Sequence, residues 1–409
     1  MRILHFADAH TGLDDSGPID RQTGLSARLT DYLDSLDRIA EYVETQDINV
    51  VVFSGDAFHV CRPTPTFERE FAKRINRMAS SAPVVVLVGN HDMPGAFGKA
   101  HPLAIYSALH VPEVHVVDRP QLLHLETHAG SIQVVGIPWP SRHNVMTSEK
   151  VAGLPKEEVN RLIGEAVAES IQKLARKMDP DLPSILAAHL SVEGGDMGGG
   201  TPVGLGTEIS LPLEAVALPQ FDYVALGHLH KYQSLNDSPP VVYAGSIERN
   251  DFGEEHEEKG FVVVELGNGD EDDLLEGAFT SVEFVPLPAR KFVTIQVSLD
   301  GTDPTQAVLQ AIGERQIEDA IVRVIIEGTA EQAALLDETQ VQRALKPALR
   351  QAVNKRIERE TRTRLEGMSY QEMSPYALLG AYLESNGKGP EECEALMKAA
   401  EELMMEVAA

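Results

Sequence analysis

Short apolar runs and amphipathic stretches alternate over residues 1–285. Residues 28–45 and 66–79 carry apolar side chains three and four positions apart, a spacing that predicts helices with one buried face. Six apolar runs rich in β-branched residues predict buried strands, namely 2–7, 48–54, 84–88, 131–137, 184–188 and 223–226. Because strands alternate with helices, this part of the chain predicts an α/β fold.

The pattern changes after Pro286 and Pro288 and predicts a small α+β unit over residues 286–366. Its expected elements are strands at 292–299 and 321–327 and helices at 304–312 and 329–353. Residues 355–364 fit both a continued helix and a strand, so their structure stays open.

Residues 367–409 predict two short helices, which begin at Pro375 and Pro390 because proline is favoured in the first turn of a helix. Two short helices bury little apolar surface by themselves. They form either a hairpin packed on their own domain or a module that binds a helix of a partner.

Composition and charge narrow the possible functions. The chain has 43% hydrophobic residues, which argues against global disorder, and a net charge of −28, which argues against a simple DNA-coating protein. Cys61 and Cys393 form neither a disulfide framework nor a cysteine zinc site. No apolar run approaches the roughly 18 residues of a membrane span. Met1 leads directly into an apolar segment without a signal-peptide pattern, so we expect a cytoplasmic location.

Three segments have an unusual composition. The glycines of residues 194–200 predict either a linker or a loop that faces a substrate, and the acidic residues 254–276 predict a solvated hairpin or rim. Residues 343–364 are basic and either contact a DNA backbone or form a solvated helix face. The candidate DNA contacts there are Arg343, Arg350, Arg356 and Arg359.

Five polar motifs follow directly after predicted strands. They contain Asp8 and His10, Gly55 and Asp56, Gly89 through Asp92, His189, and His228 and His230. Each motif is common by itself. Because ligands of α/β proteins bind at the carboxyl ends of strands, we expect the five motifs to meet at one edge of the sheet core.

These side chains predict a site for two metal ions. Carboxylate, imidazole and amide groups suit manganese, iron or zinc, and Asp56 is the best candidate for a carboxylate shared by both ions. Two cations would lower the pKa of a bound water, offset the charge of a phosphoryl group and supply the positive potential that the chain lacks. His91 could stabilise the transition state or protonate a leaving oxygen. Asp92 could orient the ring of His91 or cap the next turn.

The motifs resemble those of the calcineurin-like metallophosphoesterases and, more narrowly, of the SbcD family of DNA-repair nucleases. The narrower likeness lies in Gly55-Asp56-Ala57-Phe58-His59 with Arg62-Pro63, in Leu226-Gly227-His228-Leu229-His230-Lys231-Tyr232, and in Gly245-Ser246-Ile247-Glu248-Arg249 with Asp251-Phe252-Gly253-Glu254. It covers residues 1–285 well. Residues 286–366 are similar to the family's capping domain only in size and pattern.

The resemblance implies a double-sheet sandwich flanked by helices, a small α+β capping domain and a C-terminal helical hairpin, with domains at 1–285, 286–366 and 367–409. It implies two divalent ions, with Mn(II) expected. It also implies that His91 acts on the phosphate, that His59 orients the DNA backbone and that Arg62 contacts DNA, although His59 also fits a plain loop histidine. The implied ligands are Asp8, His10, Asp56 and His230 for one ion and Asp56, Asn90, His189 and His228 for the other.

The function implied by the resemblance is double-strand-break repair. The chain would act as a 3′→5′ exonuclease on duplex ends and an endonuclease on single strands or hairpins. It would form a homodimer, bind the coiled-coil base of an SbcC ATPase through residues 367–409, and associate with the nucleoid. Two alternatives remain: a small-molecule phosphodiesterase or phosphatase, and a non-catalytic subunit that tethers DNA ends.

Overall fold

The computed structural model describes nine segments of the chain, namely residues 1–13, 16–94, 99–140, 153–198, 209–267, 279–299, 303–358, 375–385 and 389–408. The chain divides into two compact units, which are described separately below. The first comprises Met1–Ile295, Ala311–Val324 and Gln342–Val353, and the second comprises Gln296–Gln310, Ile325–Val341 and Asn354–Ala409.

Two six-stranded sheets form the core of the first unit. The first sheet has the order β14 (Phe279–Leu287), β13 (Lys259–Gly267), β1 (Arg2–Phe6), β2 (Val50–Phe53), β3 (Val84–Leu87), β4 (Val114–Val117). The second has the order β11 (Gln233–Asp237), β12 (Pro240–Tyr243), β10 (Tyr223–Gly227), β7 (Ser184–His189), β6 (Gly130–Ile137), β5 (Gln121–Thr127). Strands β1–β4 run parallel to one another, as do β6, β7, β10 and β12. The other four are antiparallel to their neighbours.

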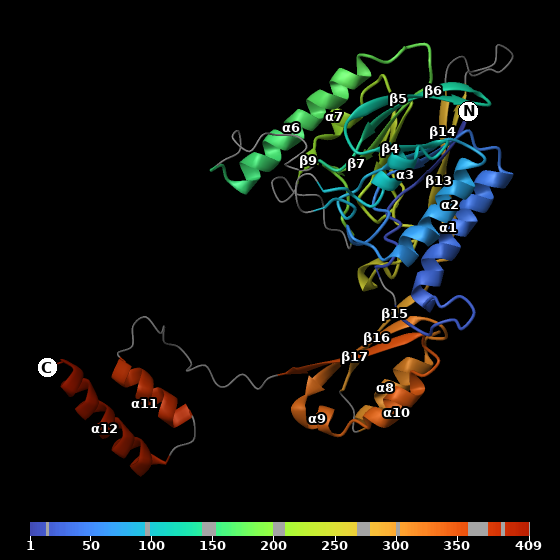
Figure 1. Ribbon diagram of the computed structural model, residues 1–409. Coiled ribbons are helices and arrows are strands. Elements are labelled where there is room, and N and C mark those ends of the chain that lie inside the picture. The colour runs from blue at the N-terminus through green and yellow to red at the C-terminus, as the bar shows by residue number, and fades with distance from the viewer. Residues whose placement is uncertain are drawn as a thin grey trace. The chain divides into compact units, whose positions relative to one another are not determined.

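Alternating side chains make each sheet apolar on both faces. In β1, Leu4 packs on the helix side of the first sheet, whereas Ile3 packs with Ile185 of β7 in the layer between the two sheets. Helices α1 (Ala27–Thr45) and α2 (Pro65–Ala79) cover the outer face of the first sheet, and α6 (Lys156–Ala175) and α7 (Leu213–Val216) cover that of the second. Figure 1 shows α6 on the opposite side of the sheets from α1 and α2. The expected double-sheet sandwich is confirmed.

The two helices of the first outer layer begin where local side chains satisfy their free N–H groups. Ser26 accepts from the N–H of Leu29 at the start of α1, and Thr64 accepts from that of Phe67 at the start of α2. The unit also contains α3 (Ala104–Leu109), β8 (Ser191–Val192), β9 (Ser210–Leu211) and the 3₁₀ helix η1 (Phe252–Glu254).

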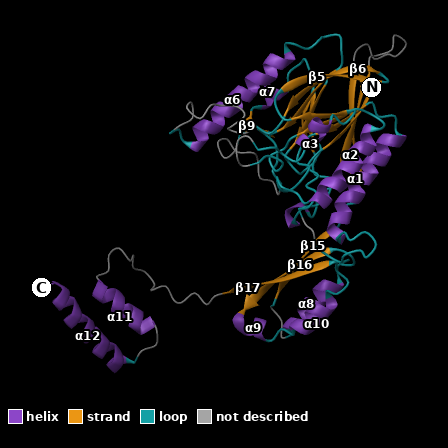
Figure 2. Cartoon of the chain, viewed as in Figure 1, coloured by secondary structure: helices purple, strands orange, loops and turns teal. Residues whose placement is uncertain are grey.

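Strands β15 (Phe292–Ser298), β16 (Ile321–Thr329) and β17 (Arg350–Glu358) form a three-stranded sheet in the order β15-β16-β17. The expected α+β pattern is thus present, with helices α8 (Pro304–Gly313), α9 (Ala330–Ala334) and α10 (Glu338–Ala344). Figure 2 shows these elements by type. The prediction of one helix over 329–353 was wrong, because two short helices replace it and Arg350 already belongs to β17.

The structure partly answers two further questions, namely the secondary structure of residues 355–364 and the surroundings of the acidic segment 254–276. Residues 355–358 are strand, and residues 359–364 lie outside the described segments. The acidic segment 254–276 does contain one arm of a hairpin, since β13 pairs with β14. It is not simply solvated, because Glu254 is 7% exposed and Lys259 is 1% exposed.

The C-terminal helices α11 (Pro375–Ser385) and α12 (Pro390–Ala408) begin at the expected prolines and contact each other. Within the described part of the chain, no helix combines the length and apolar character that crossing a membrane requires. The domain boundaries inferred from the sequence remain a prediction.

Candidate metal centre

The five polar motifs lie in loops at the carboxyl ends of strands in both sheets. Motifs after β1, β2 and β3 come from the first sheet, and motifs after β7 and β10 come from the second. The two sheets face each other, so these loops meet over one edge of the sandwich. The structure brings all seven predicted ligands together in one group of neighbouring side chains, with His59 and His91 beside them.

The backbone is strained at four of the predicted ligands. Asp8, His10, Asp56 and His228 have φ angles of 52°, 41°, 59° and 103°. Non-glycine residues in such conformations cost on the order of 1–3 kcal/mol each and concentrate at functional sites. At Gly89, an added Cβ would lie 2.1 Å from Oδ1 of Asp56, so only glycine permits this approach.

Asp8, His10 and His230 form a first cluster. Their ligand atoms lie within 4.8 Å of one another, and the Nε2 atoms of His10 and His230 are 2.9 Å apart. Asp8 also accepts a hydrogen bond from the N–H of His228, which links β1 to the loop after β10. Two ring nitrogens this close can contact one common ion.

Asn90, His189 and His228 form a second cluster. The Oδ1 atom of Asn90 lies 2.9 Å from Nε2 of His189 and 3.0 Å from Nδ1 of His228. The other ring nitrogen of His189 donates to the carbonyl of Ser54 at 2.6 Å. In the neutral ring this bond places the proton on Nδ1 and leaves the lone pair on Nε2, the nitrogen that faces Asn90.

Asp56 lies between the two clusters. Its Oδ2 atom is 3.4 Å from Nε2 of His189 and 3.7 Å from Nε2 of His10. Its Oδ1 atom accepts from the N–H of His91 at 2.9 Å, which holds the carboxylate in place. One carboxylate therefore reaches both groups of nitrogen ligands.

The electrostatics of these clusters fit bound cations. Burial raises the pKa of Asp8 and lowers the pKa of His10 well below its usual value. Burial alone would raise the pKa of Asp56 and lower the pKa of His189. The attraction between the two groups outweighs burial, so the pKa of Asp56 is lowered and the pKa of His189 is raised to about 9. A divalent cation favours ionised carboxylates and neutral imidazoles, so it would stabilise the forms of these groups that bind metal.

Comparison with known proteins agrees with this chemistry. The sequence profile of the calcineurin-like phosphoesterases matches residues 1–232. The chain belongs to the calcineurin-like phosphoesterase family. A phosphoesterase of this family uses a metal site, and the side chains described above are those with which this chain can form it.

Within this family, the chain is similar in sequence to D subunits of SbcCD nucleases. The chain is 28% identical over 280 residues to the D subunit of the SbcCD nuclease of Bacillus subtilis, a match that covers 66% of this chain and 68% of the relative. It is 26% identical to the corresponding protein of Staphylococcus epidermidis, covering 72% of each, and 26% identical to that of Escherichia coli K12, covering 66% of each. These matches support the resemblance to the SbcD family.

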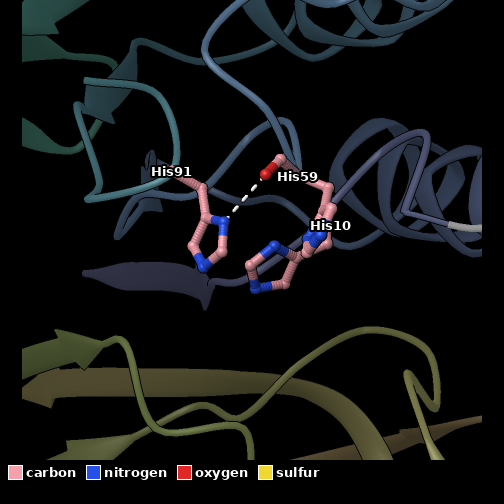
Figure 3. A group of neighbouring side chains, drawn as sticks. All are labelled: His10, His59 and His91. Atoms are coloured by element: carbon pink, nitrogen blue, oxygen red, sulfur yellow. Dashed lines mark hydrogen bonds between the residues drawn. The ribbon is translucent and has the colours of Figure 1, made fainter. Parts of the chain in front are cut away.

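His91 and His59 stand at the edge of the first cluster of this phosphoesterase. Figure 3 shows their rings beside that of His10. The Nδ1 atom of His91 donates to the carbonyl of His59, which leaves Nε2 as the free end of the ring. Ligand atoms of His10, His59 and His91 also lie within 4.8 Å of one another. The geometry therefore allows His91 either a catalytic or a ligand role.

Asp92 is fully buried and holds the loops together. Its carboxylate accepts from the N–H groups of Gly89, Ala57 and Phe58 at 3.0, 3.2 and 3.1 Å. Burial and the nearby charge of Asp56 raise the pKa of Asp92 to about 7. Among the contacts of the described residues, the ring of His91 bonds to His59 rather than to Asp92. We therefore assign Asp92 a positioning role between two loops.

Four of the predicted DNA contacts lie far along the chain from the five motifs, whereas Arg62 follows Asp56 by six residues. Arg62 is exposed in the loop before α2, Arg343 is exposed in α10, and Arg350 and Arg356 are exposed in β17. Arg350 contacts the hydroxyl of Ser16, and Arg356 pairs with Glu327. Arg359 lies outside the described segments.

Sequence reasoning missed three side chains at the candidate metal centre. Glu254 contacts the ring of His230, Lys259 contacts Glu254, and Trp139 packs on the ring of His228 with centroids 4.8 Å apart. Glu254 belongs to a motif that carries the resemblance, but it lies in a run of acidic residues that predicts a solvated surface. Trp139 is the single tryptophan and lies two residues after the end of β6, so its position after a strand was the available signal.

Proposed function

We propose that this phosphoesterase is a metal-dependent nuclease that hydrolyses DNA phosphodiester bonds. The position of Asp56, within reach of both ligand clusters, carries the proposal, because a shared carboxylate is what a pair of ions needs. The similarity to D subunits of SbcCD nucleases supports DNA as the substrate.

The proposed site binds two divalent ions, with Mn(II) as the expected metal. The residues that would hold them are Asp8, His10, Asp56 and His230 for one ion and Asp56, Asn90, His189 and His228 for the other. Bound ions would activate a water molecule and offset the negative charge of the phosphodiester. All these donors are nitrogen or oxygen atoms, which suits manganese without a cysteine ligand.

His91 is the proposed catalytic residue. Its Nδ1 proton is engaged by the carbonyl of His59, so Nε2 is the atom that can donate a proton or a hydrogen bond to a phosphate or leaving oxygen. The ring of His59 stacks on that of His91 at 4.9 Å and limits its tilt. Asp92 ties the loop of His91 to the loop after β2 and thereby maintains the distance between the two histidines.

The finer features of the proposal come from the resemblance. We propose 3′→5′ exonuclease activity on duplex ends and endonuclease activity on single strands and hairpins. We also propose a homodimer, an SbcC-type ATPase partner bound by residues 367–409, and a cytoplasmic location at the nucleoid during repair.

The experiment is a cleavage assay of the full chain with Mn²⁺ on three substrates: a linear duplex labelled at the 5′ end, a hairpin and a circular single strand. We expect shortened 5′-labelled duplex strands, cut hairpins and linearised circles, all abolished by EDTA and by Asp56→Asn. Release of the 5′ label as a mononucleotide would reverse the proposed polarity. Hydrolysis of bis(p-nitrophenyl) phosphate without any DNA cleavage would favour a small-molecule phosphodiesterase. DNA binding without hydrolysis of either substrate would favour an end-tethering subunit.

A further inference from the structure

A buried lysine ties Glu254 to the main chain of His230. The Lys259 side chain is 0% exposed, and its ammonium group lies 2.8 Å from Glu254, 2.8 Å from Glu257 and 2.9 Å from the carbonyl of His230. An ammonium has three N–H donors, so each acceptor can take one. The lysine therefore fixes Glu254 relative to the residue that the carboxylate contacts.

Glu254 determines which nitrogen of His230 carries the proton. Its Oε1 atom lies 2.7 Å from Nδ1 of His230, and Oε2 accepts from Lys259 and from the N–H of Asn250 at 2.9 Å. An ionised carboxylate can only accept, so Nδ1 must be the donor. The amide Nδ2 of Asn250 is also 3.2 Å from Nδ1, but the carboxylate is closer and charged.

This tautomer leaves the opposite ring nitrogen of His230, Nε2, without a proton. With the proton on Nδ1, the lone pair of Nε2 points toward Nε2 of His10, 2.9 Å away in the first cluster. In the other tautomer a proton would occupy that space. The carboxylate thus keeps His230 in the only neutral form that can bind a metal through Nε2.

We propose that Glu254, held by Lys259, is a positioning residue that sets the affinity of the first ligand cluster for its ion by fixing the ring tautomer of His230. This inference rests on the metal site of the proposed function. The second cluster does not depend on it, because the carbonyl of Ser54 holds the tautomer of His189. Loss of Glu254 should therefore weaken one of the two ions selectively.

Glu254→Gln is the informative variant because glutamine has one acceptor oxygen instead of two. That oxygen is needed by Lys259 and the N–H of Asn250, so the amide NH₂ turns toward Nδ1 of His230 and favours the wrong tautomer. Glu257→Gln is the matched control. It removes a carboxylate at the same 2.8 Å distance from Lys259, but among the described contacts Glu257 does not touch the His230 ring.

The first measurement follows Mn²⁺ binding to the full chain by calorimetry and by the EPR signal of free Mn²⁺. We expect two bound ions in the wild type and in Glu257→Gln. In Glu254→Gln we expect one ion to bind about 10–100-fold more weakly, the range typical of lost partners of metal-binding histidines. Quenching of the single tryptophan, Trp139, by Mn²⁺ reports the ion beside His228 and should keep its midpoint.

The second measurement needs neither metal nor activity. Nitrogen-15 correlation spectra of the histidine rings in EDTA, assigned with His230→Gln, should show the proton of His230 on Nδ1 in the wild type and in Glu257→Gln, and on Nε2 in Glu254→Gln. An unchanged tautomer, or equal weakening of both ions, would overturn the inference. A wild type that binds Mn²⁺ but does not cut DNA would defeat the proposed function and leave this inference standing.

Discussion

The ring of His91 is tied to the main chain of His59. Its Nδ1 atom donates to the carbonyl of His59 at 2.8 Å, and the two rings stack with centroids 4.9 Å apart and an angle of 27°. Because the acceptor is a backbone atom, the orientation of His91 does not require the side chain of His59. The two histidines can therefore be separated by mutation.

His91→Ala should abolish cleavage and leave the metal content unchanged. The ring offers its free Nε2 to the substrate, and loss of a general acid typically costs about 10²–10⁴-fold in rate. The measurements are the single-turnover rate of duplex cleavage and the manganese content by mass spectrometry. Loss of bound manganese would instead make His91 a ligand, an alternative that the grouping of His10, His59 and His91 permits.

His59→Ala should reduce cleavage less than His91→Ala. The variant keeps the carbonyl that accepts from His91 and removes only the stacked ring. If His59 orients the DNA backbone, the variant should raise KM more than it lowers kcat. A change in kcat as large as that of His91→Ala would show that the His59 side chain takes part in the chemistry.

Glu70→Gln should lower stability at neutral pH and have a smaller effect in acid. Glu70 accepts hydrogen bonds from Arg69, Lys73 and Arg74 at 2.8, 2.9 and 3.0 Å. Burial by itself would raise its pKa, but these three cations lower the pKa to about 2. A glutamate in the unfolded chain has a pKa of about 4.3, so the stabilisation is complete above that pH and is lost as the pH falls toward 2.

The expected loss at pH 7 is about 1 kcal/mol, since the Arg69 and Lys73 side chains are 58% and 61% exposed and solvent screens their charges. Urea unfolding of the wild type and Glu70→Gln at pH 7 and pH 3 measures it. Glu169→Gln, at an exposed position of α6, is the control and should change neither value. An effect of Glu70→Gln that is equal at both pH values would show that it does not come from the charge.

Much of the fold and the candidate site could be predicted from local patterns. Apolar runs such as residues 84–88 are almost fully buried in the sandwich, and this requirement is visible in the sequence itself. Polar residues directly after such runs, such as Asn90, had to lie at the carboxyl edge of the sheets. The sequence therefore predicted which side chains would lie together, whereas their individual roles stay predictions.

The rest depends on contacts between distant residues. Lys259 and Glu254 lie in an acidic segment that looks solvated, and only the fold brings Glu254 to the Nδ1 atom of His230, 24 positions away. Residues 350–353 have helical periodicity, but as part of β17 they lie at the edge of the sheet beside β16. Strand formation depends on such pairing more than on local preference, so the pattern was misleading there.

Neutralising Arg350, Arg356 and Arg359 together should weaken DNA binding and reduce its salt dependence. Each lost phosphate contact lowers the slope of log K against log salt by about 0.9, so the triple variant should lower it by up to about 3. The measurement is a titration of duplex DNA at several salt concentrations, with metal chelated to prevent cleavage. The side chains of the ion pair between Arg356 and Glu327 are 66% and 51% exposed, so the pair is weak. A DNA phosphate should therefore replace Glu327 as the partner of Arg356.

The control for this prediction removes three positive charges elsewhere. Exposed Lys156, Lys173 and Lys177 lie in or next to α6, and their replacement by glutamine gives the same change in net charge. This variant should keep the salt slope of the wild type. An unchanged slope in the arginine variant would identify the basic segment as a solvated surface.

A chain that ends at residue 367 should keep its nuclease activity and lose its SbcC-type partner. The candidate metal centre lies in the first unit, whereas α11 and α12 belong to the second. These helices expose apolar side chains, including Tyr376 at 38% and Leu396 at 41%, which a partner helix could cover. The measurements are Mn²⁺-dependent cleavage without ATP and co-purification with the SbcC-type ATPase.

A point variant refines the same test. Leu396→Asp places a charge on this apolar surface and should reduce co-purification, while Glu394→Gln, at an exposed polar position two residues earlier, should not. Circular dichroism of both full-length variants checks that helix content is kept. Retained binding by the chain that ends at residue 367 would move the partner site to another surface, and α11 and α12 would then be a hairpin that serves only its own domain.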